Sequence, residues 1–456
     1  MTVKTNAKDT KILLIPKPTE DPRDPLNWPM SRKLLVSFAL CSALFTGFSA
    51  AFNGQIQLAQ QAKLYGKTTV EITYFYNAFI ASKFFAGFFG NVVSVLGPLY
   101  LVDLFFLHQR GRAFNALGIA MNLGASAGPT FSGFITVHLP WYDEYWWTVG
   151  LCSGSIVLAF LFLEETSWNR VDGAANIVLE DEWFKRKVES VVVPVKLAAS
   201  PVLLLVAGFD AISFGFWVAL NALTPVWLQK PVKAGGYGFS ILDNAAFTTV
   251  HWMTLIISQI YGHLISDRIP LWLCSRRNGG VWHPELRLHA LWLPNFFLAP
   301  LGLGFVGIAM QYHLHWILMA IGNFLVTFGA IQGIPVTMNY IAECFRRTTS
   351  EATIPLTSFR LLLGLTINFY INYWISEVGI GWVYGMMAFF SVFAFFFLVI
   401  LMWKGHQIRA ASPFVHSSSE EGEVIYNEKT EPTALGSLGM SDGSMCINEK
   451  SWRNAI

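Results

Sequence analysis

The chain has little charge for its length. Aspartate, glutamate, lysine and arginine make up 13% of its 456 residues, whereas 54% are hydrophobic and 15% are aromatic. This balance argues against a soluble enzyme, whose surface is normally rich in charge. Repeated apolar runs of about twenty residues, the length that crosses a bilayer as a helix, instead indicate an all-α protein with many membrane spans.

Sequence signals of several other protein classes are also absent. A glycine-rich phosphate loop is missing, which argues against ATP-driven transport, and no arrangement of Ser, His and Asp predicts an enzyme. We therefore expect no cofactor, no metal and no nucleic acid as partners. The N-terminus lacks a secretory signal pattern, so the first span is expected to direct insertion. The cysteines are few and scattered, without the spacing of a zinc site or a disulfide framework: Cys41, Cys152, Cys274, Cys344 and Cys446.

The apolar runs predict about ten spans, divided unequally between two halves. We expect a polar leader (1–33), a first membrane half (34–163), a charged cytoplasmic segment (164–198), a second membrane half (199–403) and a disordered tail (404–456). The predicted spans lie near 34–54, 75–105, 113–138, 145–163, 199–225, 241–265, 289–309, 315–338, 352–374 and 380–403.

The distribution of positive charge predicts how the chain is oriented. On this layout the outer loops hold only Lys63, Lys67, Lys230 and Lys233, and nearly all other lysines and arginines fall in the inner segments. Positive residues concentrate on the cytoplasmic side of membrane proteins. We therefore expect a multi-pass protein, in the plasma membrane, with both termini in the cytoplasm.

The stretch Gly118–Gly133 reads GIAMNLGASAGPTFSG and carries the most informative motif. Gly124 and Gly128 are four residues apart, so they share a helix face that admits another backbone closely. Pro129 removes a backbone donor and kinks the helix, which lipid tolerates only beside a partner or a cavity. With Gly133, this string resembles the antiporter motif of major facilitator superfamily exporters, although Ser132 replaces one closing glycine. The alternative is an ordinary small-residue helix contact.

A second motif begins at Gly262 and continues through Asp267 and Arg268 to a basic stretch and Pro-Glu-x-Arg-Leu at 284–288. It resembles the cytoplasmic loop of the second half in fungal drug:proton antiporters. The resemblance implies a cytoplasmic latch, in which Asp267 and Arg268 pair with Glu343 in one access state. The alternative is that these are merely inner positive charges. Residues assigned to the latch are Gly262, Asp267, Arg268, Arg276, Arg277, Glu343 and, as the counterpart of Glu343 in the first half, Asp103.

The resemblance also implies two halves of six spans each, twelve in all. The first half is short of that number. The residues up to Phe79 look like the start of a second span and those from Lys83 look like the start of a fourth, so two spans and their loop are absent between them. Arg110 and Arg112 are the only nearby substitutes for the missing basic loop beside Asp103.

Ionisable and amide side chains inside the spans are costly and are candidates for function. Asp210 lies near the middle of its span and could exchange protons, or it could only orient helix packing. Polar residues four apart on two other spans could line a cavity or join helices by hydrogen bonds. His251 could join a proton path, although such histidines more often serve packing. The candidate cavity and proton-path residues are Asp210, Arg360, Asn368, Asn372, Asn115 and Asn122.

Taken as a resemblance, these motifs imply a fungal exporter of the drug:proton antiporter type. Such a protein moves small organic molecules outward in exchange for protons by rocking its two halves, and we expect it to act as a monomer in the lipid bilayer. The apolar, aromatic-rich spans favour an amphipathic or weakly charged substrate. Two alternatives stay open: a nutrient uptake permease, and a truncated remnant or product of incorrect exon boundaries that transports nothing.

Overall fold

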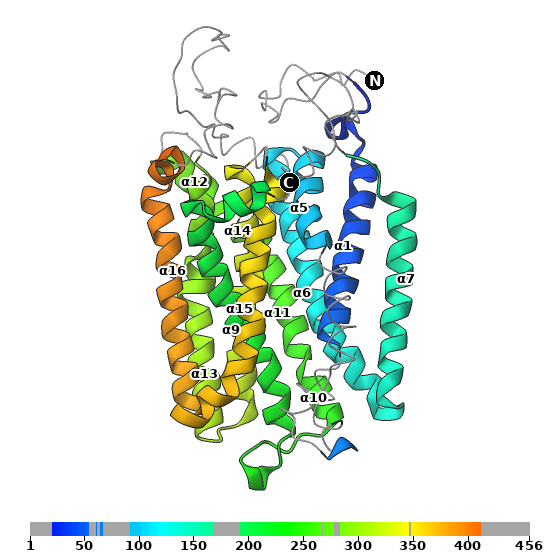
Figure 1. The fold of residues 1–456 in the computed structure, drawn as a ribbon, viewed down its shortest axis with the longest axis vertical. Helices are drawn as coiled ribbons and strands as arrows, with labels where there is room; N and C mark the ends of the chain where they lie inside the picture. Colours follow the sequence, from blue (N-terminus) through cyan, green and yellow to red (C-terminus); the bar gives the residue numbers. More distant parts are fainter. Residues whose placement is uncertain are drawn as a thin grey trace.

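Long helices packed side by side form the described part of the chain in the computed structural model (Figure 1). The structure describes residues 21–53, 61, 64–66, 92–166, 192–266, 268–277, 283–345 and 348–411, and these ranges contain no β-strand. The α-helices are α1 (Met30–Phe52), α5 (Val92–Leu104), α6 (Leu107–His138), α7 (Glu144–Phe162), α9 (Pro201–Gln229), α10 (Ile241–Phe247), α11 (Thr249–Tyr261), α12 (Arg268–Arg277), α13 (Ala299–Gln311), α14 (Trp316–Cys344), α15 (Thr349–Val378) and α16 (Ile380–Ala411).

Several helices have the length and hydropathy of membrane spans. Within the described residues six pass such a test, and the bent helix α15 makes a seventh if its two segments are one span. The prediction of an all-α, polytopic membrane protein is therefore confirmed. One further predicted span is a broken helix, because the run 241–265 is divided into α10, α11 and a π-helical turn (Gly262–Ser266). The predicted span 289–309 is among the six as Pro284–Gln311, in which a 3-10 helix (Pro284–Leu291) and a π-helix (Trp292–Leu298) precede α13.

Local sequence explains where several helices begin and end. Pro201 follows the extended residue Ser200 and opens α9, as proline does best in a first helical turn. Ser240 and Asp243 form a capping box that starts α10. Gly379, with φ of +85°, ends α15 and turns the chain into α16. The helix bounds therefore follow from turn and cap residues as well as from hydropathy.

Figure 1 shows how the helices are grouped. Helices α1, α5, α6 and α7 form a first group on one side, and α9, α13, α14, α15 and α16 lie on the other side. Helices α10 and α11 lie between them and are counted with this second group. Helix α6 is the meeting point, because it packs on α1 within the first group and on α10, α11 and α14 of the second. The helix that carries the glycine-proline motif therefore forms much of the boundary between the two groups.

The glycines of α6 determine how closely α6 approaches α1. A Cβ atom on Gly124 would overlap the backbone of Phe45, and one on Gly128 would lie 2.6 Å from the Ser49 carbonyl oxygen. The Ser49 hydroxyl donates a 3.0 Å hydrogen bond to the Gly124 carbonyl. The two glycines form the close helix contact expected from their spacing.

Some expectations fall outside the described residues or differ from the structure. The join between Phe79 and Lys83 lies outside those residues, as does the predicted span 75–105 up to position 91. Cys274 is disulfide-bonded, which the scattered cysteines did not predict, whereas Cys41, Cys152 and Cys344 are free thiols.

Replacing Gly124 by alanine should destabilise the helix packing. The added methyl group meets the Phe45 backbone, which cannot move without shifting α1, so we expect a loss of about 1–3 kcal/mol and a lower melting temperature of the purified protein. The matched control is Gly154→Ala on α7, where an added Cβ meets no atom within 4 Å. Equal melting temperatures for the two variants would contradict the close α1–α6 contact.

Candidate functional site

A cavity of about 30 Å³ lies where the two groups of helices meet. That volume is room on the order of one or two water molecules. The first group contributes Phe52 from α1 and part of α6, and the second contributes parts of α9, α10, α11 and α14. Its walls are Phe52, Ala125, Ser126, Pro129, Trp217, Asn221, Thr224, Pro225, Asn244, Phe247, Thr248, His251 and Asn323.

Two helix prolines, one from each group, line this cavity. Pro129 in α6 cannot donate to the Ala125 carbonyl, and Pro225 in α9 cannot donate to the Asn221 carbonyl. Both prolines and both of these carbonyl-bearing residues are wall residues. A lipid-facing helix does not tolerate such a gap, but a polar cavity does. The motif proline therefore lies beside a cavity, one of the two surroundings that a proline inside a membrane helix requires.

His251 is the titratable residue of the cavity wall. Its side chain is buried, and neither ring nitrogen has a hydrogen-bond partner of ordinary distance and angle. Its nearest polar neighbours are Asn323 and the Thr248 carbonyl. The Asn323 amide nitrogen is also unpartnered, whereas its oxygen accepts a 3.2 Å hydrogen bond from Thr327.

Asp210 and Arg360 form a second buried polar site, between α9 and α15. They are 2% and 1% exposed, and the charge of each acts on the other without a direct ion pair between them. The Thr337 hydroxyl of α14 lies 2.9 and 3.0 Å from the two Asp210 carboxylate oxygens. The Arg360 guanidinium carbon is 5.6 Å from the centroid of the Phe214 ring, one helical turn after Asp210, and its Nη1 has no hydrogen-bond partner.

The other predicted cavity residues do not join this site, although Asn115 lines a separate cavity of about 20 Å³. The Asn115 amide donates a 3.0 Å hydrogen bond to Gln259 of α11, which joins the two groups of helices. Asn122 is buried and donates to the Gly118 carbonyl of its own helix at 2.8 Å. Asn372 is exposed, and the side chain of Asn368 lies outside the described residues. The predicted stripe along α15 is therefore not one buried face, because α15 bends by 44°.

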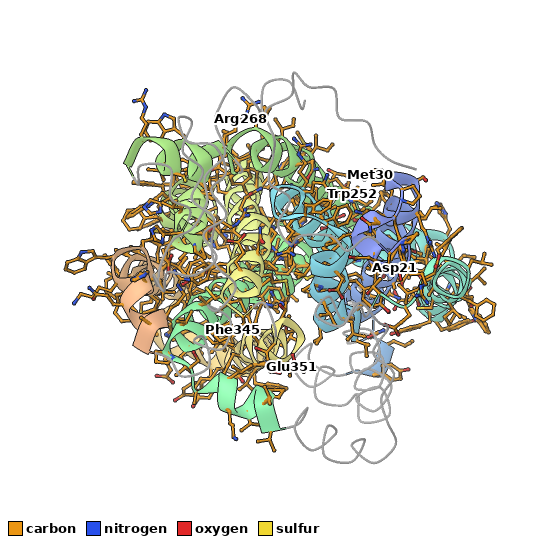
Figure 2. All side chains as sticks on the ribbon, turned by 90° about the horizontal axis from the view of Figure 1, so that it is seen from above. Asp21, Met30, Trp252, Arg268, Phe345 and Glu351 are labelled. Carbon is orange, nitrogen blue, oxygen red and sulfur yellow. The ribbon has the colours of Figure 1, made fainter. Side chains whose placement is uncertain are left out.

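Glu343, which the latch prediction pairs with Asp267 and Arg268 in one access state, contacts a different arginine in this structure. Buried Glu343 accepts a 2.6 Å hydrogen bond from Arg287, and the two form an ion pair. Figure 2 shows Arg268 at the rim of the bundle, while Phe345, two residues after Glu343, lies within its outline. Arg268 follows the π-helical turn, and its side chain is exposed. Arg268 therefore does not reach the buried Glu343.

The remaining latch residues lie around this pair. Arg276 is exposed over the Trp272 ring, and Asp267 and the side chain of Arg277 lie outside the described residues. Gly262 lies against Asn115, since a Cβ there would be 2.6 Å from the Asn115 amide nitrogen. Asp103 is half-buried near the end of α5, where Arg110 donates to the carbonyls of Val102 (2.9 Å) and Phe105 (3.1 Å).

Three polar contacts were not singled out from the sequence. Glu285, two residues before Arg287, pairs with Arg409 of α16 at 2.7 Å. Ser132, the residue that replaces a motif glycine, donates a 2.5 Å hydrogen bond to Glu144, a fully buried acid in the first turn of α7. Glu164 pairs with Arg32, and this hydrogen bond lowers the pKa of Glu164. In the sequence, two of these residues could have been noticed. Glu144 is an acid within an aromatic stretch, and Arg409 is a basic residue near the end of the last helix.

Comparison with known proteins finds one family model and several fungal transporters that are similar to this chain. The family model for the Major Facilitator Superfamily matches residues 30–281. The uncharacterized transporter mfc1 of Schizosaccharomyces pombe is 23% identical over 376 residues, covering 74% of this chain and 73% of its own. The efflux pump radE of Floropilus chiversii is 25% identical and covers 79% and 72%, and the MFS transporter cpaT of Aspergillus oryzae is 25% identical and covers 84% and 82%.

A solved structure shares the fold. The human organic anion transporter MFSD10 (TETRAN) superposes with a TM-score of 0.51 over 80% of this chain and 82% of its own, at 15% sequence identity. At that identity the likeness concerns the arrangement of helices alone.

Replacing Glu343 by glutamine should destabilise the protein strongly. The change leaves the Arg287 charge buried without its partner, which costs about 3–5 kcal/mol for comparable buried pairs. The matched control is Glu164→Gln, because the Arg32–Glu164 pair is exposed and such pairs contribute less than about 1 kcal/mol. Melting temperatures of the detergent-purified variants measure the difference, and a larger loss for Glu164→Gln would refute the assignment.

Proposed function

Because this chain belongs to the major facilitator superfamily, whose family model covers residues 30–281, we propose that it exports small organic molecules in exchange for protons. It is a multi-pass membrane transporter, and members of this family handle small-molecule substrates. The direction of transport, the proton coupling and a plasma-membrane location are the parts that we add. The buried pair of Asp210 and Arg360 is the observation that carries the coupling.

The glycine-proline helix supports export rather than uptake. Gly124 and Gly128 bring α6 against α1, while Pro129 of the same helix lines the cavity between the two groups. This string resembles the motif of exporters, and relatives named as efflux pumps are 24–25% identical to the chain. A helix that packs tightly on one side and borders the cavity on the other can transmit a change in the cavity to the whole first group.

Asp210 has the properties that proton exchange requires. It is a buried acid, and its negative charge acts on the buried Arg360 of a different helix. When Asp210 takes up a proton, this attraction is lost and the charge of Arg360 is left unbalanced in a dry environment. The contact between α9 and α15 then becomes less favourable, so proton binding biases the arrangement of these helices. In the exchange that we propose, this bias accompanies the change of access.

The alternating movement that we propose uses the interface along α6. The Thr130 hydroxyl lies 2.6 Å from that of Thr248, and Trp252 donates to Thr130 at 3.2 Å. Asn115 contacts Gln259 about four helical turns away, toward the other end of α6. These contacts join the two groups of helices at two levels of α6, and the movement that we propose breaks one set while the other stays.

Export should depend on a proton gradient and on Asp210. We expect yeast cells that lack their own drug exporters to accumulate less of at least one fluorescent amphipathic compound when they express the chain. A protonophore should abolish the difference. Asp210→Asn, which cannot ionise, should reduce gradient-driven efflux about tenfold or more, and the fluorescence of cells over time measures the rate.

The matched control is Glu377→Gln, an equivalent change at an exposed acid on α15. It should leave efflux unchanged at equal surface expression. Efflux that persists undiminished in the presence of the protonophore would sink the proton coupling. If no compound in a broad panel is exported although the protein reaches the membrane, the chain is the non-transporting remnant instead.

A further inference from the structure

The cavity at the interface has a chemistry that restricts what it can bind. Its wall residues include no Asp, Glu, Lys or Arg, and its polar side chains are hydroxyls, carboxamides and the His251 imidazole. A ligand with a permanent charge would be buried there without a counter-charge, at a cost of several kcal/mol by general estimates. The cavity therefore disfavours carboxylates and quaternary ammonium groups.

Two side chains in the wall, His251 and Asn323, lie close to each other and have buried polar atoms without a well-aligned hydrogen bond. His251 and Asn323 are 7% and 1% exposed, and neither His251 nitrogen nor the Asn323 amide nitrogen has a hydrogen bond of ordinary geometry. Buried polar atoms almost always have partners, so each such atom needs an explanation. A neutral imidazole offers one donor and one acceptor, and the amide nitrogen offers donors.

The prolines supply further acceptors at the same wall. Because Pro129 and Pro225 lack an N–H, the carbonyls of Ala125 and Asn221 lose their usual helical donors. The wall thus offers both donors and acceptors. A hydroxyl or carbonyl group matches this mixture, since a hydroxyl donates and accepts and a carbonyl accepts from His251 or Asn323.

The apolar part of the wall is largely aromatic. Phe52 of α1 and Trp217 of α9 meet with ring centroids 5.9 Å apart, and Phe247 completes the wall. Aromatic side chains favour aromatic partners in offset or edge-to-face contact. The cavity volume of about 30 Å³ admits only one small polar group, so a ring attached to that group needs the space beside Phe52 and Trp217 that opens when the two groups of helices separate.

We propose that this cavity selects uncharged aromatic compounds bearing a hydroxyl or carbonyl group, with His251 and Asn323 as the residues that determine specificity. The inference rests on the proposed function, because it names the substrate class of the same transporter. It is separate from the proton coupling, because Asp210 and Arg360 do not line this cavity.

The test compares three probes that share one ring system: 2-naphthol, 2-naphthoate and 2-(aminomethyl)naphthalene. At neutral pH the first is uncharged, the second is an anion and the third is a cation. Binding of each labelled probe to the full chain in lipid nanodiscs is measured by scintillation proximity. Displacement by excess unlabelled probe separates binding at a site from partitioning into lipid.

We expect 2-naphthol to bind roughly tenfold or more tightly than either charged probe, because a charge buried in this wall has no counter-charge. His251→Leu should lower that ratio about fivefold, the contribution of about one neutral hydrogen bond to 2-naphthol, whereas His251→Gln, which keeps a donor and an acceptor, should restore part of it. His315→Leu, the same change at an exposed histidine, should leave the ratio unchanged.

Several outcomes would overturn the inference. Tighter binding of 2-naphthoate means that a protonated His251 recognises anions, and tighter binding of the cation means that the carbonyls dominate. Equal ratios in wild type and His251→Leu, or no displaceable binding of 2-naphthol, refute the role of His251. Since the assay measures binding without a gradient, selective binding that persists while gradient-driven efflux is absent separates this inference from the proposed function.

Discussion

The absence of water inside a bilayer is the constraint on which this structure depends. A buried polar group there must find its partner within the protein or beside a cavity. Asp210 has the hydroxyl of Thr337 and the charge of Arg360, and these three residues come from three different helices. The cost of leaving any one of them alone is large, so the buried charges determine which helices pack together as much as the apolar side chains do.

The same constraint explains why the cavity is where it is. A proline inside a helix removes one donor from the backbone, and lipid offers nothing in exchange. In this chain Pro129 and Pro225 come from different groups of helices and border one cavity, together with the carbonyl-bearing residues that they affect. The two prolines and the polar cavity therefore occur together, because the cavity tolerates the backbone carbonyls that the prolines leave without a donor.

Sequence reasoning predicted the helices and single residues better than it predicted pairs. Gly124 and Gly128 could be assigned to a close contact because residues four apart share a helix face, which is a local property. Asp210 and Arg360 stood out individually because charge in a span is costly. That they face each other depends on how α9 and α15 pack. For the same reason Arg268 was chosen for Glu343, although the 3-10 helix brings Arg287 there.

The strength of the contacts differs within and between the two groups of helices. The buried ion pairs Arg287–Glu343 and Arg409–Glu285 each join elements of one group. The hydrogen bonds that cross the boundary at Thr130–Thr248 and Asn115–Gln259 are between neutral side chains. A neutral hydrogen bond contributes less to the free energy of folding than is lost when a buried charge pair is broken. A boundary of this kind can separate at a small cost while each group keeps its internal packing, which is what a rocking transporter requires.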